Sequence, residues 1–398
     1  MKTNSTGNYD KTVRVVKKSF LIILTVLFIV VAISIVPTKK FKSTNNFLRA
    51  DQAQNATTAT KIIPINVVAG NIYDITKYGG TEVKTKAAFT KEALKDIDNS
   101  SIYFTGKTYT YRYTKVPLAV TKNNSVVIND GGNLYELTRL DEQKNKTVKD
   151  YTLLELQNFN ICKGHLNSDG TNPYTDGTYD FGLTSCQVLE FERTYKTDFS
   201  GLKYFVEISE TEEEDIKVIL DLLSGLSSSA TRILIYNPSD KVADIIDNNA
   251  NYSKLNRTYT EAEATKFINR ISRNTAKFYN VKHPVLVLNE KSEIDKLYNK
   301  KVVSRLHKLN VSVIVDISNS DVDYNLTNDE RNAKISETQE MMKKLLINGV
   351  DGFVSHYPET LNRAIATINT DATTEFNKTT TTTTKKPVSS SSTTKKAD

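Results

Sequence analysis

The sequence predicts an α/β protein whose central part folds as a closed TIM (β/α)8 barrel, behind a transmembrane helix at the N-terminus. Short, almost continuous apolar runs alternate with amphipathic runs of helical period, which is typical of parallel strands covered by helices. About eight such strands fall within roughly 310 residues, a length that suits a closed barrel better than an open sheet. On pattern alone, an open doubly wound sheet stays an alternative.

An apolar run near the N-terminus predicts the transmembrane helix. Ser19 to Val36 contains no charged residue, and lysines flank this run on both sides. At 1.5 Å per residue it spans about 27 Å, close to the thickness of the hydrocarbon core. A cleaved signal peptide has a shorter apolar region and a small-residue cleavage site. We therefore expect an uncleaved signal anchor over residues 19–37, with a short cytosolic N-terminus at residues 1–18.

Polar segments bound the predicted barrel on both sides. Residues 38–60 show no periodicity and indicate a linker, whereas the Thr/Ser/Lys-rich residues 371–398 indicate a disordered tail. The barrel is therefore expected over residues 61–370, outside the cytosol, in the secretory lumen or at the cell surface. The net charge of +7 comes from the two ends of the chain. Because no basic stripe interleaves with aromatic residues, we expect a membrane partner through the N-terminal helix and no nucleic acid.

Strand and helix patterns alternate along the predicted barrel. Acidic residues open the helix expected over 213–226, where the helix dipole favours them. The expected strands lie at 62–69, 116–120, 126–129, 204–208, 232–236, 284–288, 311–317 and 352–355. The expected helices lie at 84–97, 213–226, 240–247, 260–278, 293–309, 328–347 and 360–368.

Two sequence features bear on the compartment of the barrel. Cys162 and Cys186 are the two cysteines of the chain. In an oxidising compartment they would form a disulfide that stabilises the fold by about 3 kcal/mol, and two free buried thiols are the alternative. Asn-x-Ser/Thr sequons, which would make the chain a glycoprotein, permit a lumenal barrel without demonstrating one, since many arise by chance in such a composition. They lie at Asn55, Asn99, Asn123, Asn145, Asn251, Asn256, Asn310, Asn325 and Asn377.

Five stretches in consistent order resemble the glycerophosphodiester phosphodiesterase family, a family of PLC-like phosphodiesterase TIM barrels. The stretch NGVDGFVSHYPETL at 348–361 is similar to the last strand and following helix of that family. The other similar stretches are 65–69 with 85–89, 121–130, 151–156 and 205–209. The resemblance covers about residues 62–370 and implies the barrel fold and a hydrolase that uses a divalent cation.

The same resemblance implies that most catalytic residues are absent. The family holds its cation on an ExD pair and a later Glu, and uses two histidines as general acid and base. Of this set, the third metal ligand is retained as Glu207. The degenerate positions are Gly70 and Asn71 in the first His-Arg-Gly triplet, Asn129 for the second His, and Lys115 and Pro117 for the ExD pair.

We therefore expect a catalytically inactive protein without a cofactor, in which the barrel is a binding or structural module. One carboxylate cannot hold Mg²⁺ or Ca²⁺ tightly, because these ions need several oxygen ligands. Lys115, Glu207 and His356 are the candidates to line a pocket for a phosphate- or glycan-containing ligand. A simple salt bridge between Lys115 and Glu207 explains the two residues equally well.

Two other functions stay open from the sequence. The chain could be an active, Mg²⁺- or Ca²⁺-dependent phosphodiesterase or phospholipase of glycerophosphodiesters or lysophospholipids. Its rearranged site would then use Glu207 with Asp130, His165 or His356. A glycosidase barrel is the third hypothesis, and it lacks a convincing pair of carboxylates.

Overall fold

The structure is a computed structural model, and it describes the barrel region with gaps. The described residues are 66–69, 73–74, 85–86, 90–91, 94–95, 101–104, 107–110, 113–165, 172, 174, 186–226, 232–273, 281–289, 294–317, 336–338, 340–342, 344–345 and 348–355. The predicted anchor at 19–37, the linker, the tail, Gly70, Asn71 and His356 lie outside these ranges. Among the helices within them, none has both the length and the apolar character needed to cross a membrane.

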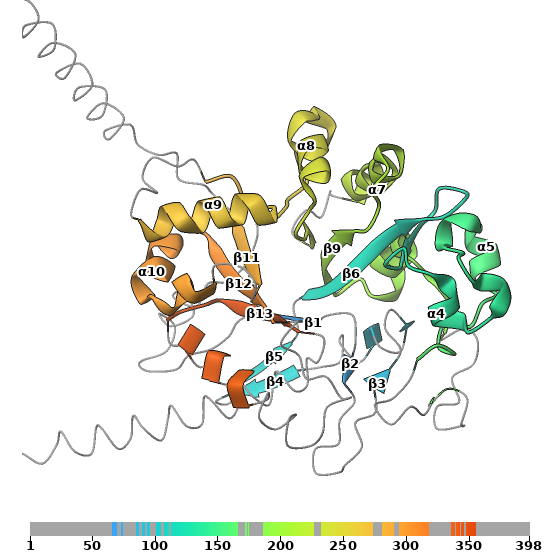
Figure 1. The fold of residues 1–398 in the computed structure, drawn as a ribbon, viewed down its shortest axis with the longest axis horizontal. Coiled ribbons are helices and arrows are strands. Elements are labelled where there is room, and N and C mark those ends of the chain that lie inside the picture. The colour runs from blue at the N-terminus through green and yellow to red at the C-terminus, as the bar shows by residue number, and fades with distance from the viewer. Residues whose placement is uncertain are drawn as a thin grey trace, which may run out of the picture.

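A sheet of parallel strands forms the centre of the fold (Figure 1). The strands are β1 (Asn66–Ala69), β6 (Tyr113–Val120), β9 (Lys203–Ile208), β10 (Ile233–Ile235), β11 (Val285–Asn289), β12 (Ser312–Asp316) and β13 (Gly352–Ser355). Their order in the sheet is β10-β9-β6-β1-β13-β12-β11, and each neighbouring pair is parallel. On one side of β1 lie β6, β9 and β10, and on the other side lie β13, β12 and β11, so each neighbour in the sheet is the next parallel strand along the chain. With the first and last strands paired, this is the topology of a (β/α)8 barrel.

A short segment takes the place of the eighth parallel strand, between β10 and β11 in the chain. Arg257 forms an isolated parallel bridge with Ile235. The N–H of Ile235 donates to the carbonyl of Asn256 at 2.9 Å, and the N–H of Thr258 donates back to Ile235 at 2.9 Å. The sequence did not predict this segment, because three polar residues, Asn-Arg-Thr, lack the apolar run of a barrel strand.

The helices that follow the strands lie on the outside of the sheet (Figure 1). They are α7 (Glu213–Leu226), α8 (Asp240–Asn248), α9 (Glu261–Ser272) and α10 (Lys300–Lys308). In α7, Ile216, Ile219, Leu220 and Leu223 are buried at the spacing of one helical face. The helix predicted at 293–309 is divided into a 3₁₀ turn, η8 (Ile294–Tyr298), and α10, because Asn299 caps a new helix by accepting from the N–H of Lys301.

Apolar side chains pack on both faces of the barrel strands. In β9, Tyr204 and Val206 join the core beneath the helices, whereas Phe205 belongs to a smaller cluster with Leu234 and Ile314. Burial on both faces explains why the barrel strands form continuous apolar runs in the sequence instead of alternating ones.

An antiparallel extension follows β6. A turn at 122–124 connects β6 to β7 (Val126–Ile128), with Asn124 at φ 58°. Strand β7 pairs in turn with β8 (Leu189–Glu190). Between and after these strands lie short helical elements. These are α4 (Leu134–Thr138), η1 (Asp141–Gln143), η2 (Val148–Asp150), α5 (Leu153–Leu156), α6 (Phe191–Arg193), the π-helical η4 (Thr194–Asp198) and, after α8, η6 (Ala250–Tyr252).

Two small antiparallel sheets lie between β1 and β6 in the chain. They are β2 (Tyr73–Asp74) with β3 (Thr85–Lys86), and β4 (Ser101–Phe104) with β5 (Lys107–Thr110). The prediction of a helix over 84–97 is wrong at its start, because Thr85 and Lys86 pair with β2. The sequence did not reveal this strand because a strand of two residues is too short to alter the helical spacing of apolar residues in the segment around it.

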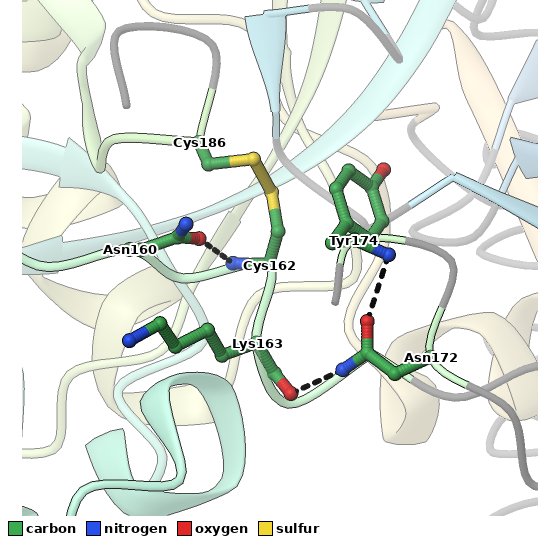
Figure 2. Close-up of a disulfide and its surroundings, with 6 residues drawn as sticks. All are labelled: Asn160, Cys162, Lys163, Asn172, Tyr174 and Cys186. Atoms are coloured by element: carbon green, nitrogen blue, oxygen red, sulfur yellow. Dashed lines mark hydrogen bonds between the residues drawn. A yellow bond between two sulfur atoms is a disulfide. The ribbon is translucent and has the colours of Figure 1, made fainter. Parts of the chain in front are cut away.

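The two cysteines form a disulfide, as one of the two alternatives predicted (Figure 2). The Cα atoms of Cys162 and Cys186 are 5.5 Å apart, and both residues are buried. The ring of Tyr174 packs against the pair. Asn172 holds this loop by donating from Nδ2 to the carbonyl of Lys163 at 2.5 Å and accepting from the N–H of Tyr174 at 2.9 Å.

Removing the disulfide should destabilise the protein. We expect the double variant Cys162→Ser/Cys186→Ser to lose about 3 kcal/mol of unfolding free energy, since the 24-residue separation between the cysteines restricts the unfolded chain. Urea unfolding of the oxidised protein, the reduced protein and the variant measures the effect. Reduced wild type and variant should agree, and equal stability of the variant and the oxidised protein would contradict the prediction.

Candidate functional site

The mouth of the barrel is the face where the carboxyl ends of the parallel strands meet. The structure places four polar side chains there: Lys115 of β6, Glu207 near the end of β9, Tyr236 directly after β10, and Asp316 at the end of β12. The ring of Tyr236 packs in the smaller apolar cluster with Phe205 and Leu234, and its hydroxyl forms a hydrogen bond with Asp316. These residues are the candidate functional site.

Lys115 and Glu207 form an ion pair in the mouth. The Nζ atom of Lys115 lies 3.1 Å from Oε2 of Glu207. The Lys115 side chain is 10% exposed and that of Glu207 37%, so the ammonium is the more enclosed partner. The two residues reach each other because β6 and β9 pair with Pro117 opposite Glu207, which places Lys115 two residues away on the neighbouring strand. This geometry is the simple salt bridge that the sequence left open.

The Lys115 ammonium also lies over an aromatic ring. Its Nζ atom is 4.9 Å from the centre of the Tyr236 ring, a cation–π distance. The Tyr236 ring in turn stacks on Phe205, with 5.7 Å between ring centres. Lys115 is therefore held on two sides, by a carboxylate and by an aromatic face.

The Tyr236 hydroxyl donates a hydrogen bond to Oδ2 of Asp316. Burial, followed by the negative charges of Asp316 and Glu207, raises the pKa of Tyr236 well above its ordinary value. Tyr236 thus stays a protonated hydrogen-bond donor at neutral pH. Sequence reasoning missed this pair, although both residues lie at the carboxyl ends of predicted strands, where a barrel places functional groups.

A cavity of about 710 Å³ opens beside Glu207. The starts of α8 and α9 form its other walls, and its lining includes Asn237, Asp240, Glu261 and Lys266. Asn237 has φ 39°, in the left-handed region, and its N–H donates to Oγ1 of Thr258 at 2.8 Å. The lining contains three carboxylates and one lysine, so this cavity favours hydrogen-bond donors and disfavours anions.

Asn129, which the sequence resemblance aligns with the second family histidine, supports a turn. It is 2% exposed, and its Oδ1 atom accepts from the N–H of Gly131 at 2.8 Å. Asp130 accepts in the same way from Gly132 and is exposed. The ring of His165 packs on Tyr174 in the disulfide loop, 5.8 Å between ring centres. Of the predicted site residues, the structure brings together Lys115 and Glu207.

The residues of the mouth do not fit a divalent cation. A cation about 4 Å from an ammonium is opposed by about 8 kcal/mol at an effective dielectric constant of 20, and one carboxylate offers a similar attraction. With Lys115 already 3.1 Å from Glu207, the contributions of these two residues cancel. The second carboxylate of the mouth, Asp316, already accepts the hydrogen bond of Tyr236. Pro117, opposite Glu207, supplies no side-chain oxygen.

A second group of potential metal ligands lies between α8 and α9. One ligand atom each from Asp247, Glu263 and His283 fall within 4.8 Å of one another. Arg257 lies among them: its Nε and Nη2 atoms bond Asp247 at 3.1 and 2.8 Å, and its Nη1 and Nη2 atoms bond Glu263 at 2.7 and 3.1 Å. Nη1 also donates to the carbonyl of Thr258 at 3.0 Å, so all five N–H groups are bonded. The guanidinium and the ammonium of Lys282, which lies 3.8 Å from Asp247 and 3.6 Å from Glu263, already supply the positive charge beside the two carboxylates.

Burial and the Arg257 guanidinium together shift the pKa values of Glu263 and His283 in this cluster. Burial has the largest single influence on Glu263 and disfavours its charge. The hydrogen bonds from Arg257 and from the N–H of Thr260, together with the charge of Arg257, outweigh burial and lower the pKa of Glu263 to about 2. Burial, followed by the charge of Arg257, lowers the pKa of His283 to about 4. His283 is therefore neutral at pH 7, and its approach to Glu263 at 3.9 Å is not an ion pair. We interpret the cluster as a structural network.

Comparison with known proteins identifies the fold. No protein-family model and no curated protein sequence matches the chain. Among solved structures, the glycerophosphoryl diester phosphodiesterase domain of a Mycobacterium tuberculosis protein is 12% identical with a TM-score of 0.50, over 76% of this chain and 99% of that one. A glycerophosphodiester phosphodiesterase from Agrobacterium tumefaciens is 9% identical with a TM-score of 0.46, over 75% and 99%.

A phosphodiesterase from Oleispira antarctica, solved with its product sn-glycerol-3-phosphate, is 14% identical with a TM-score of 0.45, over 76% and 96% of the two chains. The Mycobacterium domain, with the TM-score of 0.50, shows the fold. Together with the strand order around β1, this likeness confirms the prediction from the sequence: the chain has the TIM-barrel fold of the glycerophosphodiester phosphodiesterases.

Proposed function

We propose that this chain is a catalytically inactive relative of the glycerophosphodiester phosphodiesterases, and that its barrel is a membrane-anchored binding or structural module. The observation that carries the proposal is the ion pair of Lys115 with Glu207 at 3.1 Å. In this ion pair Glu207, the one retained metal ligand of the family, is already bound to Lys115. The Lys115 ammonium would then occupy the place where the family holds its cation. Such a site lacks the Lewis acid that the family uses for phosphodiester hydrolysis.

The disulfide and the apolar run at 19–37 support the proposed location. A buried disulfide is typical of proteins in oxidising compartments and rare in the cytosol. A signal anchor with a cytosolic N-terminus would place the barrel on the opposite side of the membrane, in such an oxidising compartment.

The cavity beside Glu207 supports a glycan-containing ligand over a phosphate-containing one. Glu207, Asp240 and Glu261 would repel a phosphate, whereas sugar hydroxyls can donate to all three carboxylates. Titration of the full chain in detergent with maltotriose, a neutral probe, and with inorganic phosphate tests this preference. Phosphate binding that Lys266→Ala abolishes would reverse it.

The alternative is an active phosphodiesterase with a rearranged site. The observation in its favour is Asp316, a second carboxylate in the mouth beside Tyr236. For this alternative, Lys115 would have to leave Glu207 so that Glu207 and Asp316 could share a cation.

A hydrolysis assay decides between the two. The purified full chain in detergent would be incubated with glycerophosphodiesters and lysophospholipids and with Mg²⁺, Ca²⁺ or Mn²⁺, beside an active relative. We expect no turnover above the matched variant Glu207→Ala. Metal-dependent turnover that Glu207→Ala abolishes would overturn the proposal and establish the alternative.

A further inference from the structure

Five of the sequons lie in described parts of the chain, and the structure divides them into two kinds. Asn123, Asn145 and Asn251 are exposed, whereas Asn256 and Asn310 are half-buried. A glycan is a bulky, hydrated group that a folded protein accommodates only at its surface. Exposure of the asparagine therefore separates usable sequons from unusable ones.

The three exposed asparagines lie in turns. Asn123 is in the turn between β6 and β7, Asn145 lies between η1 and η2 at φ 62°, and Asn251 lies in η6. Within the described residues, the side chains of Asn145 and Asn251 make no hydrogen bond that a glycan would displace. Turns at the surface leave room for a large substituent.

At Asn123 the side chain is bonded through its oxygen. Oδ1 of Asn123 accepts from Oγ1 of Thr121 at 2.8 Å and from the N–H of Leu153 at 3.1 Å. An N-linked glycan attaches to Nδ2 and leaves this oxygen as an acceptor. Both hydrogen bonds can therefore persist in the modified protein.

The other two sequons have their hydroxyl residue in the interior. Thr258, of the Asn256 sequon, is fully buried, and its Oγ1 atom accepts from the N–H of Asn237. Ser312, of the Asn310 sequon, is 3% exposed and belongs to β12. The carbonyl of Asn256 accepts from the N–H of Ile235 beside the bridge to β10, and Asn310 lies two residues before β12. A half-buried asparagine this close to the barrel strands leaves little room for a glycan.

We propose that Asn123, Asn145 and Asn251 carry N-linked glycans and that Asn256 and Asn310 do not. The proposal rests on the location given above, a barrel outside the cytosol. An observation independent of the sequons supports that location: the disulfide between Cys162 and Cys186 forms in the compartments where N-glycosylation takes place. The modification joins the asparagine Nδ2 to a sugar carried on a lipid pyrophosphate, with release of that leaving group.

The test uses the full chain expressed in a eukaryotic secretory system. Peptide N-glycosidase in ¹⁸O-water converts each glycosylated asparagine into labelled aspartate, which mass spectrometry assigns to its residue. We expect label at positions 123, 145 and 251, and none at 256 and 310. Each of Asn123→Gln, Asn145→Gln and Asn251→Gln should remove one glycan step on a gel, whereas the control variants Asn256→Gln and Asn310→Gln should leave the mobility unchanged.

Alkylation of free thiols in the same samples distinguishes failure of the glycan assignment from failure of the proposed location. Unreactive cysteines with no label at the three exposed positions, or with label at Asn256 or Asn310, would overturn the glycan assignment and leave the location standing. Reactive cysteines with no label at any sequon would overturn both. Neither result bears on catalytic inactivity, which the hydrolysis assay decides.

Discussion

Arg257→Met should cost about 3 to 5 kcal/mol of unfolding free energy, the largest effect we expect from one substitution. Arg257 is 2% exposed, and all five of its N–H groups are bonded within the described structure. Its removal takes away five hydrogen bonds and the enclosed positive charge between Asp247 and Glu263, and leaves the half-exposed Lys282, at 3.8 and 3.6 Å, as their remaining cation. Breaking an ion pair with a buried partner has a cost of this size.

The same residue holds the shortest segment of the barrel. Arg257 lies at the isolated bridge to β10, so its bonds connect the end of α8, this segment and the start of α9. Urea unfolding of the full chain in detergent measures the loss. The matched control is Arg139→Met, which breaks an exposed pair with Glu136 and should cost under about 1 kcal/mol. Equal losses in the two variants would show that the network does not stabilise the fold.

Acid should destabilise the protein through His283, by about 3 kcal/mol between pH 7 and pH 4. Burial lowers the pKa of His283 to about 4, below the ordinary value of 6.5. Between these two values the unfolded chain binds a proton at this residue and the folded chain does not. The unfolding free energy therefore falls as the pH falls from 6.5 towards 4.

The variant His283→Gln isolates this contribution. Glu263, with its pKa lowered to about 2, also loses its stabilising effect as the pH falls below its ordinary range, but it does so in both proteins. Unfolding free energies of wild type and variant at pH 7 and pH 4 give the difference. We expect a flatter pH profile for His283→Gln, and parallel profiles would exclude His283 as the source.

The barrel was predictable because its strands are buried on both faces. Continuous apolar runs such as 311–317 follow from that burial, and β12 occupies residues within it. The segment around Arg257 was not predictable in the same way, since polar residues form a bridge there that only the neighbouring strand and helices stabilise. Hydrogen bonds to residues distant in the sequence stabilise this segment in place of an apolar run, and a local sequence pattern does not predict them.

The site was predictable in part. The resemblance aligned Lys115 and Glu207 with two metal-ligand positions of the family, and the structure shows that the two side chains lie together. It gave no indication of the Tyr236–Asp316 hydrogen bond, because neither residue belongs to a motif that the family shares with this chain. It also placed Asn129 at a family histidine, whereas the structure shows this side chain holding a turn.

We propose that the Lys115 ammonium stands where the family holds its cation. Titration of the full chain with Mn²⁺, followed by electron paramagnetic resonance of the free ion, tests it directly. We expect no Mn²⁺ binding in the wild type that Glu207→Ala removes. We expect a gain of binding in Lys115→Glu, which replaces the ammonium beside Glu207 by a further carboxylate. Micromolar Mn²⁺ binding by the wild type that is lost in Glu207→Ala would show that the mouth holds a cation on Glu207 in spite of Lys115.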